Sequence, residues 1–154
     1  MTTRVEIIAV GSLHRDIEPA SRHYLDLLRP LAAVTVREVR EVPLKGRIEG
    51  EVLREEGRRL LAAWPQTPVV AALAVEGRPM ETEVFAAWLQ RSLERGGAGF
   101  VLGGSLGLSD DVKARSDVLI SLSALTLPHQ LARVLLLEQL FRAGKILRRE
   151  PYHH

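Results

Sequence analysis

The chain has 154 residues, the size of one domain, and no cysteine, which excludes disulfides, thiolate metal ligands and cysteine nucleophiles. Its formal net charge is only +2, and the last thirteen residues hold four Lys or Arg against one Glu. This short basic tail is either simply solvated or a contact for a polyanion. No apolar run approaches the roughly 18 residues that a membrane helix needs, and the start of the chain reads as a strand rather than a signal peptide, so we expect a cytoplasmic protein without membrane contacts.

Apolar runs of strand length alternate with helical patterns along the whole chain. We predict strands at 4–10, 33–39, 68–75, 100–102 and 117–122, and helices at 16–28, 51–63, 82–94, 109–114 and 128–147. The run 68–75 is continuously apolar, which is typical of a central parallel strand, whereas 33–39 alternates and suits a sheet edge. The pattern predicts one three-layer α/β domain over residues 1–154 with a mostly parallel sheet.

Local signals add detail at several element ends. Thr82 and Ser109 are predicted helix N-caps, and Pro128 is predicted to open the last helix. Residues 76–79, Glu-Gly-Arg-Pro, read as a turn. The polar loop at 43–50 places Lys45 and Arg47 where they could contact phosphates if the protein acts on nucleic acid.

Three predicted strands, ending at Ala74, Leu102 and Leu122, deliver loops to the same edge of the sheet. The second loop contains Gly103, Gly104 and Gly107 directly after its strand, where the absence of Cβ atoms lets the backbone approach a ligand. Neither a P-loop nor a Gly-x-Gly-x-x-Gly motif is present. Because open α/β sheets bind ligands outside the carboxyl ends of their strands, these loops predict one crevice.

The third loop, rich in Ser and Thr, leads from the last strand into the helix at 128–147. We place the cofactor at this fixed strand-to-helix turn. The helix is apolar on nearly every side from Leu131 to Leu147, which requires burial on more than one face. Two interpretations remain open, a second face packed on a partner subunit or a plain core helix.

Several stretches together resemble one family. They are Leu-Ser-Ala-Leu-Thr-Leu-Pro-His at 122–129, Glu-Gln-Leu-Phe-Arg-Ala at 138–143 and the terminal Pro-Tyr-His-His, preceded by the glycine cluster. The chain resembles the ribosomal RNA large subunit methyltransferase H family, small SPOUT methyltransferases, over its whole length. The resemblance implies transfer of a methyl group from S-adenosylmethionine to N3 of a pseudouridine in 23S rRNA. It also implies a homodimer and a deep trefoil knot at the carboxyl terminus, which connection rules would not suggest.

The resemblance also implies which residues contact the cofactor. These are Leu73, Gly103, Gly104 and Gly107, together with Leu122, Ser123, Ala124, Leu125, Thr126 and Leu127. Small and aliphatic residues in tight turns provide the flat apolar slot and backbone groups that adenine needs. Three positions depart from the family pattern, with Ala74 in place of an expected Asp, Ser105 in place of Ala or Pro, and Phe141 in place of Tyr.

N3 of a uracil-type base is protonated at neutral pH, so its methylation needs a base or a group that stabilises the anion. The candidate catalytic residues are Arg142, Tyr152, His153, His129 and His154. His129 has a second interpretation, as a residue that only orients the first helical turn. The last three residues could also be a frayed terminus, but the resemblance implies that they reach an active site, that of the other subunit. No metal is expected.

The chain has no spare domain for RNA recognition, so the expected substrate is an assembled ribosomal particle. Two other functions remain open. One is a non-catalytic ribosome-binding or RNA-binding protein on the same fold, which the loss of an acid at Ala74 makes conceivable. The other is a small nucleotide- or flavin-binding protein, which the missing phosphate-binding loop disfavours.

Overall fold

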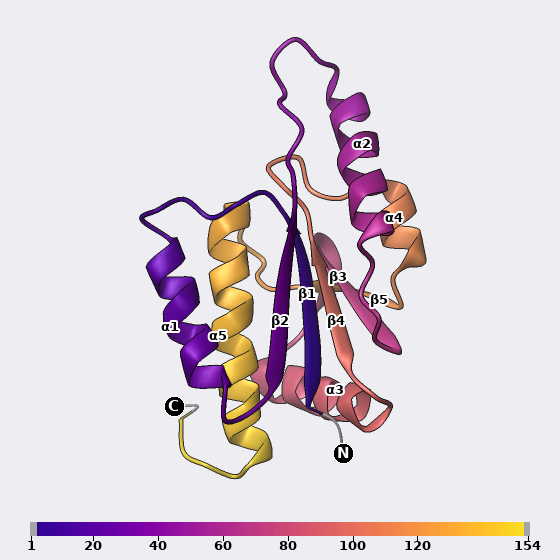
Figure 1. The fold of residues 1–154 in the computed structure, drawn as a ribbon. Helices are drawn as coiled ribbons and strands as arrows, with labels where there is room; N and C mark the ends of the chain where they lie inside the picture. The colour runs from indigo at the N-terminus through magenta and orange to yellow at the C-terminus, as the bar shows by residue number, and fades with distance from the viewer. Residues whose placement is uncertain (1–2, 153–154) are drawn as a thin grey trace.

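The computed structural model describes residues 3–152, in which strands and helices alternate from end to end (Figure 1). The strands are β1 (Arg4–Val10), β2 (Ala33–Val39), β3 (Val69–Pro79), β4 (Ala98–Leu102) and β5 (Val118–Ser121). The helices are α1 (Glu18–Leu28), α2 (Glu49–Ala62), α3 (Thr82–Glu94), α4 (Asp110–Arg115) and α5 (His129–Leu147). All strand pairs are parallel, in the order β2-β1-β4-β3-β5.

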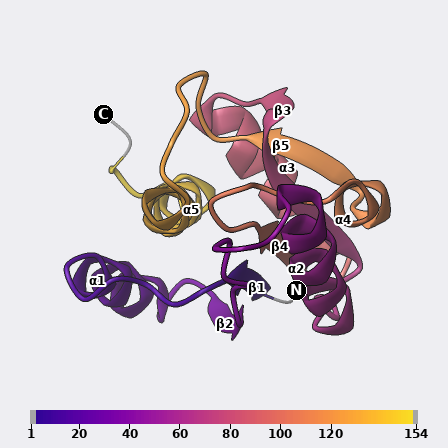
Figure 2. The same cartoon turned by 90° about the horizontal axis from the view of Figure 1, so that it is seen from above.

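The helices cover both faces of the sheet, so the molecule has three layers. One face carries α1, α3 and α5, which share a core with side chains such as Phe100 and Ile120. The other face carries α2 and α4, whose apolar residues pack on Ile8 and Val101. Figure 2 shows α1 and α5 on one side of β1 and β4 and α2 and α4 on the other. The predicted three-layer α/β fold is confirmed.

Burial along the strands follows their place in the sheet. β4 lies in the middle and is buried at every position, and β1 is buried after its first residue. β2 lies at an edge and alternates between exposed and partly buried positions. A strand covered on both faces needs continuous apolar sequence, whereas an edge strand tolerates polar residues. The predicted central strand is β3, which pairs with β4 on one side and β5 on the other. Its burial is confirmed for Val69–Ala72 but not for Val75, which is 64% exposed. The predicted edge position of 33–39 is confirmed.

The carboxyl half of β3 differs from the prediction. Residues 76–79 are not a separate turn, because Leu73 and Arg78 both pair with Ile120 and the chain between them bulges out of the ladder. A Cβ atom on Gly77 would lie 2.7 Å from the carbonyl carbon of Ile120, so only glycine allows this approach. Gly77 and Pro79, which suggested a turn, therefore belong to a β-bulged stretch of β3. The bulge leaves residues 74–76 unpaired with β5, at the carboxyl ends of the strands.

Two predicted helix starts also need correction. Thr82 is not the N-cap of α3; Glu81 holds that position, and the Thr82 hydroxyl donates to Oε1 of Gln139 on α5 over 3.0 Å. Pro128 is the N-cap of α5 rather than its first helical residue. The Ser109 cap of α4 is confirmed, since its Oγ accepts a hydrogen bond from the Val112 amide over 3.4 Å. The Thr82 hydroxyl, which the local pattern predicted to cap α3, thus bonds instead to a residue distant in sequence, Gln139.

The broad apolar surface of α5 is mostly buried within the chain itself. The helix packs against both α1 and α3 as well as the sheet, and Leu136, Leu140 and Phe141 are buried there. Leu131, near its start, keeps 47% of its surface exposed. The core-helix interpretation therefore accounts for most of this surface. Within residues 3–152, no helix is long and apolar enough to cross a membrane.

Candidate functional site

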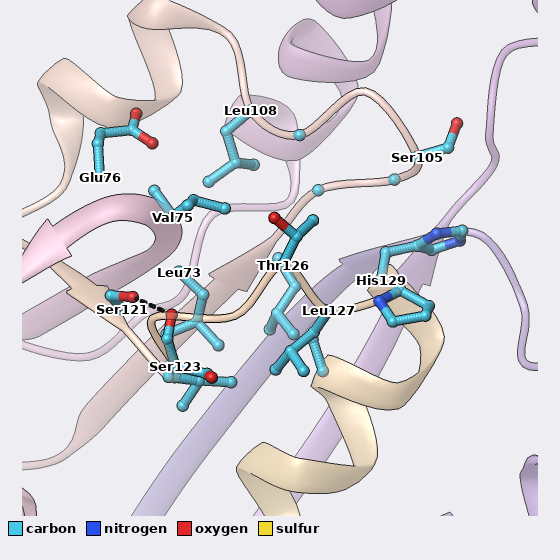
Figure 3. A pocket seen from close by; sticks show the side chains of 18 of the residues that line it. Leu73, Val75, Glu76, Ser105, Leu108, Ser121, Ser123, Thr126, Leu127 and His129 are labelled. Carbon is cyan, nitrogen blue, oxygen red and sulfur yellow. Dashed lines mark hydrogen bonds between the residues drawn. The ribbon is translucent and has the colours of Figure 1, made fainter. Parts of the chain in front are cut away.

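A pocket of about 680 Å³ opens at the carboxyl ends of β3, β4 and β5 (Figure 3). Its walls come from the three loops that follow these strands and from the first turn of α5. The lining residues are Leu73, Ala74, Val75, Glu76, Leu102, Gly103, Gly104, Ser105, Leu106, Gly107, Leu108, Lys113, Ser121, Leu122, Ser123, Leu125, Thr126, Leu127, Pro128, His129 and Ala132. The volume lies in the range of small-molecule and cofactor sites.

The glycine loop after β4 forms one wall, and its shape depends on missing side chains. A Cβ atom on Gly103 would lie 2.2 Å from the carbonyl oxygen of Gly107, far inside van der Waals contact. Gly107 has a φ of +82° and donates its amide to the Gly104 carbonyl over 3.1 Å. The loop therefore folds back on itself and presents backbone to the pocket.

The loop between β5 and α5 forms the opposite wall and is held by its own serines. The Ser121 hydroxyl donates to the Ser123 carbonyl over 2.9 Å, and Ser123 Oγ accepts the Leu125 amide over 2.9 Å (Figure 3). These bonds give the turn a defined conformation without a regular element. Leu125 extends outward with 75% of its surface exposed.

The pocket also contains a charged pair that sequence analysis missed. Nζ of Lys113, on α4, lies 2.5 Å from Oε1 of Glu76, which lies in the bulge of β3. This hydrogen bond lowers the pKa of Glu76 below its usual value of 4.5, so the carboxylate is charged at neutral pH. Glu76 and His129 lie at opposite sides of the pocket in Figure 3. The family pattern predicts a carboxylate at position 74, which is Ala74 here. Glu76, two residues later, supplies a carboxylate to the same pocket.

Nine of the ten predicted cofactor contacts line this pocket. They are Leu73, Gly103, Gly104, Gly107, Leu122, Ser123, Leu125, Thr126 and Leu127. Ala124 lies in the same loop but not on the pocket wall. Of the three departures, Ala74 and Ser105 also line the pocket, whereas Phe141 is buried elsewhere on α5.

The predicted catalytic residues form two separate groups. His129 lines the pocket, whereas Arg142 lies thirteen residues further along α5, a rise of about 20 Å. Arg142 donates to the Tyr152 carbonyl over 3.3 Å, and its guanidinium carbon lies 4.9 Å from the centre of the Tyr152 ring. His153 and His154 lie outside the described residues. Within one chain, Arg142 and Tyr152 therefore lie together on α5 at a distance from His129 and the pocket.

The Arg142 guanidinium is held in place by a second partner on its own helix. Nε and Nη2 of Arg142 donate to Oε1 of Glu138 over 2.9 and 2.6 Å. This hydrogen bond raises the pKa of Arg142 above its usual value, so the side chain stays positively charged. Tyr152 in turn packs edge-to-face on Phe141, with ring centres 4.6 Å apart. Tyr152 is thus docked on the last turns of α5.

The start of α5 is fastened to the ends of β1 and β2 by a buried arginine. Nη1 of Arg133 donates to the Gly11 carbonyl over 3.0 Å, and Nη2 lies 2.8 Å from Oε2 of Glu38. Because His129 and Ala132 on the same turns line the pocket, these bonds set the position of its α5 wall. Within the described part of the chain, no group of three or more His, Asp or Glu is arranged to hold a metal ion.

A family model described as "Predicted SPOUT methyltransferase" matches residues 3–153. The chain belongs to the SPOUT methyltransferase family. A relative named "Ribosomal RNA large subunit methyltransferase H", from Listeria welshimeri serovar 6b, is 43% identical over 156 residues, covering 97% of this chain and 98% of the relative. The resemblance seen in the sequence is confirmed.

Solved structures of low sequence identity share the SPOUT fold. The "Probable Methyltransferase" from Bordetella pertussis Tohama I is 18% identical with a TM-score of 0.62, covering 92% of this chain and 96% of that one. The SpoU methyltransferase AviRb from Streptomyces viridochromogenes, solved with its cofactor AdoMet, is 17% identical with a TM-score of 0.51, covering 92% and 58%. The fold is therefore one that such methyltransferases have in common.

Proposed function

We propose that this chain, acting as a single cytoplasmic domain in each subunit of a homodimer, uses S-adenosylmethionine to methylate N3 of a pseudouridine in 23S rRNA. The observation that carries the proposal is the pocket, where nine residues expected from the family surround one cavity of about 680 Å³. Family membership and the name of the 43% identical relative support the same activity and substrate class.

The pocket residues suit S-adenosylmethionine chemically. The aliphatic side chains of Leu73, Leu122 and Leu127 offer an apolar slot for adenine, and the backbone of the 103–107 loop offers hydrogen-bonding groups. The charged Glu76 carboxylate can accept hydrogen bonds from hydroxyl or ammonium groups of the cofactor. When bound, the cofactor would supply an electrophilic methyl group on a sulfonium ion.

The chain's own residues would then handle the proton and the charge of the target base. N3 must lose its proton to become a nucleophile, and a neutral histidine is a suitable acceptor near pH 7. His129 is the candidate on the pocket wall, and His153 and His154 are the candidates in the tail. Arg142 and Tyr152 can stabilise the negative charge on the base carbonyls by donating hydrogen bonds.

We place the tail of one subunit at the pocket of the other. Along α5 of one chain, Arg142 lies about 20 Å from His129, so an isolated subunit keeps the two groups apart. Packing of two subunits around α5 would join them, and the exposed Leu125 and Leu131 lie beside the pocket, where a partner can cover them. With this dimer we propose the carboxyl-terminal trefoil knot of the family.

A second function is favoured by one residue. Ala74 lines the pocket without the carboxylate expected there, which suits a non-catalytic ribosome-binding or RNA-binding protein that has lost its cofactor. The presence of Glu76 in the same pocket argues for the methyltransferase. A thermal-shift measurement separates the two, because only the methyltransferase is stabilised by S-adenosylmethionine or its demethylated product.

The deciding test is transfer of labelled methyl groups to ribosomes that lack the modification, with the protein in catalytic amounts. We expect the label in N3-methylpseudouridine and no transfer to a short free RNA hairpin. Absence of label from a folded dimer that also fails to bind S-adenosylmethionine would favour the non-catalytic function.

A further inference from the structure

Positively charged side chains without partners gather on the segment between β2 and α2 and on the first two turns of α2. Arg40, Lys45, Arg47 and Arg54 are exposed, and none of their side chains forms an ion pair or hydrogen bond with another residue in the range 3–152. Most other arginines of the protein are paired, as Arg58 is with Glu55 over 2.7 Å. Unpaired, solvated cations on one segment are the electrostatic feature that a polyanion contact requires.

The start of this segment is anchored to α2, although the segment projects from the sheet. The Val42 amide donates to Oε2 of buried Glu56 over 2.9 Å, and Nη1 of Arg59 donates to the Arg40 carbonyl over 2.8 Å. In Figure 1 the segment rises beyond the carboxyl edge of the sheet, next to the loop that follows β4. The cations are therefore presented on an anchored scaffold at the edge where the pocket opens.

A groove lies on the same surface, between the loop and the first three turns of α2. It is lined by the charged residues Arg47, Glu51, Arg54, Glu55, Arg58 and Arg59. Glu55 is occupied by Arg58 and Arg59, and Glu51 lies in the first turn, where an acid complements the helix dipole. Arg47 and Arg54 remain unpaired at this groove.

The groove is separated from the pocket by the width of one helix. Gly57 on the inner side of α2 packs directly on Ser109, where a Cβ atom would lie 2.3 Å from its hydroxyl oxygen. Gly104, on the pocket wall, lies in ordinary contact range of Glu56, whose Oε1 would be 3.4 Å from an added Cβ. A helix with its side chains is about 10 Å across, so a strand with one base in the pocket reaches the groove within a few nucleotides.

We propose that Arg40, Lys45, Arg47 and Arg54 form a second contact surface that binds phosphates of the RNA flanking the target base. The inference rests on the proposed function, because it takes the substrate to be RNA. This surface holds the four cations, three exposed carboxylates (Glu41, Glu49 and Glu51) and two exposed apolar side chains (Leu44 and Ile48), so its charge is +1. A mostly charged surface with a net positive charge suits a phosphate backbone better than a protein interface. The surface positions the substrate and takes no part in proton transfer.

The experiment measures binding of the full-length dimer to ribosomal particles that lack the modification, at several salt concentrations. The test variant is Arg47→Gln/Arg54→Gln. The matched control is Arg91→Gln/Arg95→Gln on α3, which removes the same charge from two exposed arginines that have no ion-pair partner in the described range. Arg47→Lys/Arg54→Lys keeps the charge and should retain binding.

In the test variant we expect about tenfold weaker particle binding near 0.1 M salt. The slope of log K against log salt should fall by about 1.5, since two phosphate contacts are lost. The control should match the wild type, and stabilisation by S-adenosylmethionine should be the same in all variants. Weakening of both double variants to the same degree, or of neither, would overturn the proposal.

Two further outcomes separate this proposal from the function it rests on. Wild-type protein that is stabilised by S-adenosylmethionine but does not bind the particles would overturn the RNA surface and leave a methyltransferase with another substrate. If Leu44→Ser/Ile48→Ser loses particle binding while Arg47→Gln/Arg54→Gln keeps it, the surface would be assigned to a protein partner instead.

Discussion

The pocket and the tail of this protein are built in different ways. Most of the pocket wall comes from the bulge of β3 and from the loops that follow β4 and β5, three adjacent parallel strands, so sheet geometry brings most of its walls together. The tail candidates Arg142 and Tyr152 contact each other at the far end of α5, about 20 Å from His129. One chain can therefore form the candidate binding site for a cofactor, whereas it holds Arg142 and Tyr152 away from His129, which is why we propose that a second chain completes the site.

The largest expected effect comes from removing the tail. Deletion of residues 150–154 should lower methyl transfer by at least a thousandfold, because Tyr152, His153 and His154 are lost together. Cofactor binding and the proposed dimer should persist, since Tyr152 does not line the pocket of its own chain. Methyl transfer and cofactor titration on the truncated protein check this, and unchanged turnover would remove the tail from the mechanism.

The next effect concerns the pocket alone. Gly103→Ala places a methyl group 2.2 Å from the Gly107 carbonyl oxygen, so the loop must shift, and cofactor affinity should fall by a hundredfold or more. Gly50→Ala is the matched control, because nothing lies within 4 Å of its Cβ position. Calorimetric titration with S-adenosylmethionine compares the two. Equal affinities would show that the glycine loop is not part of the cofactor site.

A smaller effect is expected from the arginine that fastens the start of α5. Arg133→Met leaves the Gly11 carbonyl and Glu38 without their partner and should reduce the free energy of unfolding by about 2 kcal/mol. Arg22→Met, which breaks an exposed pair with Glu18, should cost less than about 0.5 kcal/mol. Denaturant unfolding of the two variants measures the difference, and equal losses would contradict the anchoring role of Arg133.

The smallest effect is a titration. Because Lys113 lowers the pKa of Glu76, the carboxyl should titrate below 4.5, and Lys113→Met should return it toward that value. Because the pKa of Glu76 is lower in the folded state, the ionised carboxylate stabilises the fold at pH values above its unfolded pKa of about 4.5. This stability is lost as the pH falls through the pKa of the folded state. Since Glu76 is more than half exposed, the change in stability should be slight. Carboxyl chemical shifts against pH measure the midpoint directly.

Much of the pocket was predictable because its residues follow strands. Leu73, Gly103 and the 122–127 loop stand at strand ends that periodicity already indicated, and parallel strands carry such ends to one edge. Lys113 was missed because it lies on a short helix whose place beside β3 depends on packing. Glu76 was missed because residues 76–79 were predicted to form a turn. A Gly-containing bulge has the same local sequence as a turn, and only its pairing with β5 distinguishes the two.

The sequence by itself determined the alternation of strands and helices, the place of the central and edge strands, the family, and nine residues of the pocket wall. The alternation and the strand places follow from local patterns and from the fixed geometry of parallel strands, whereas the family and the nine pocket residues follow from the family resemblance. Only the tertiary structure decided that α5 is buried by α1 and α3, that Glu76 pairs with Lys113, and that Arg142 docks with Tyr152 far from His129. Each of these contacts joins residues from different parts of the chain, and whether such residues meet depends on how helices and strands pack together.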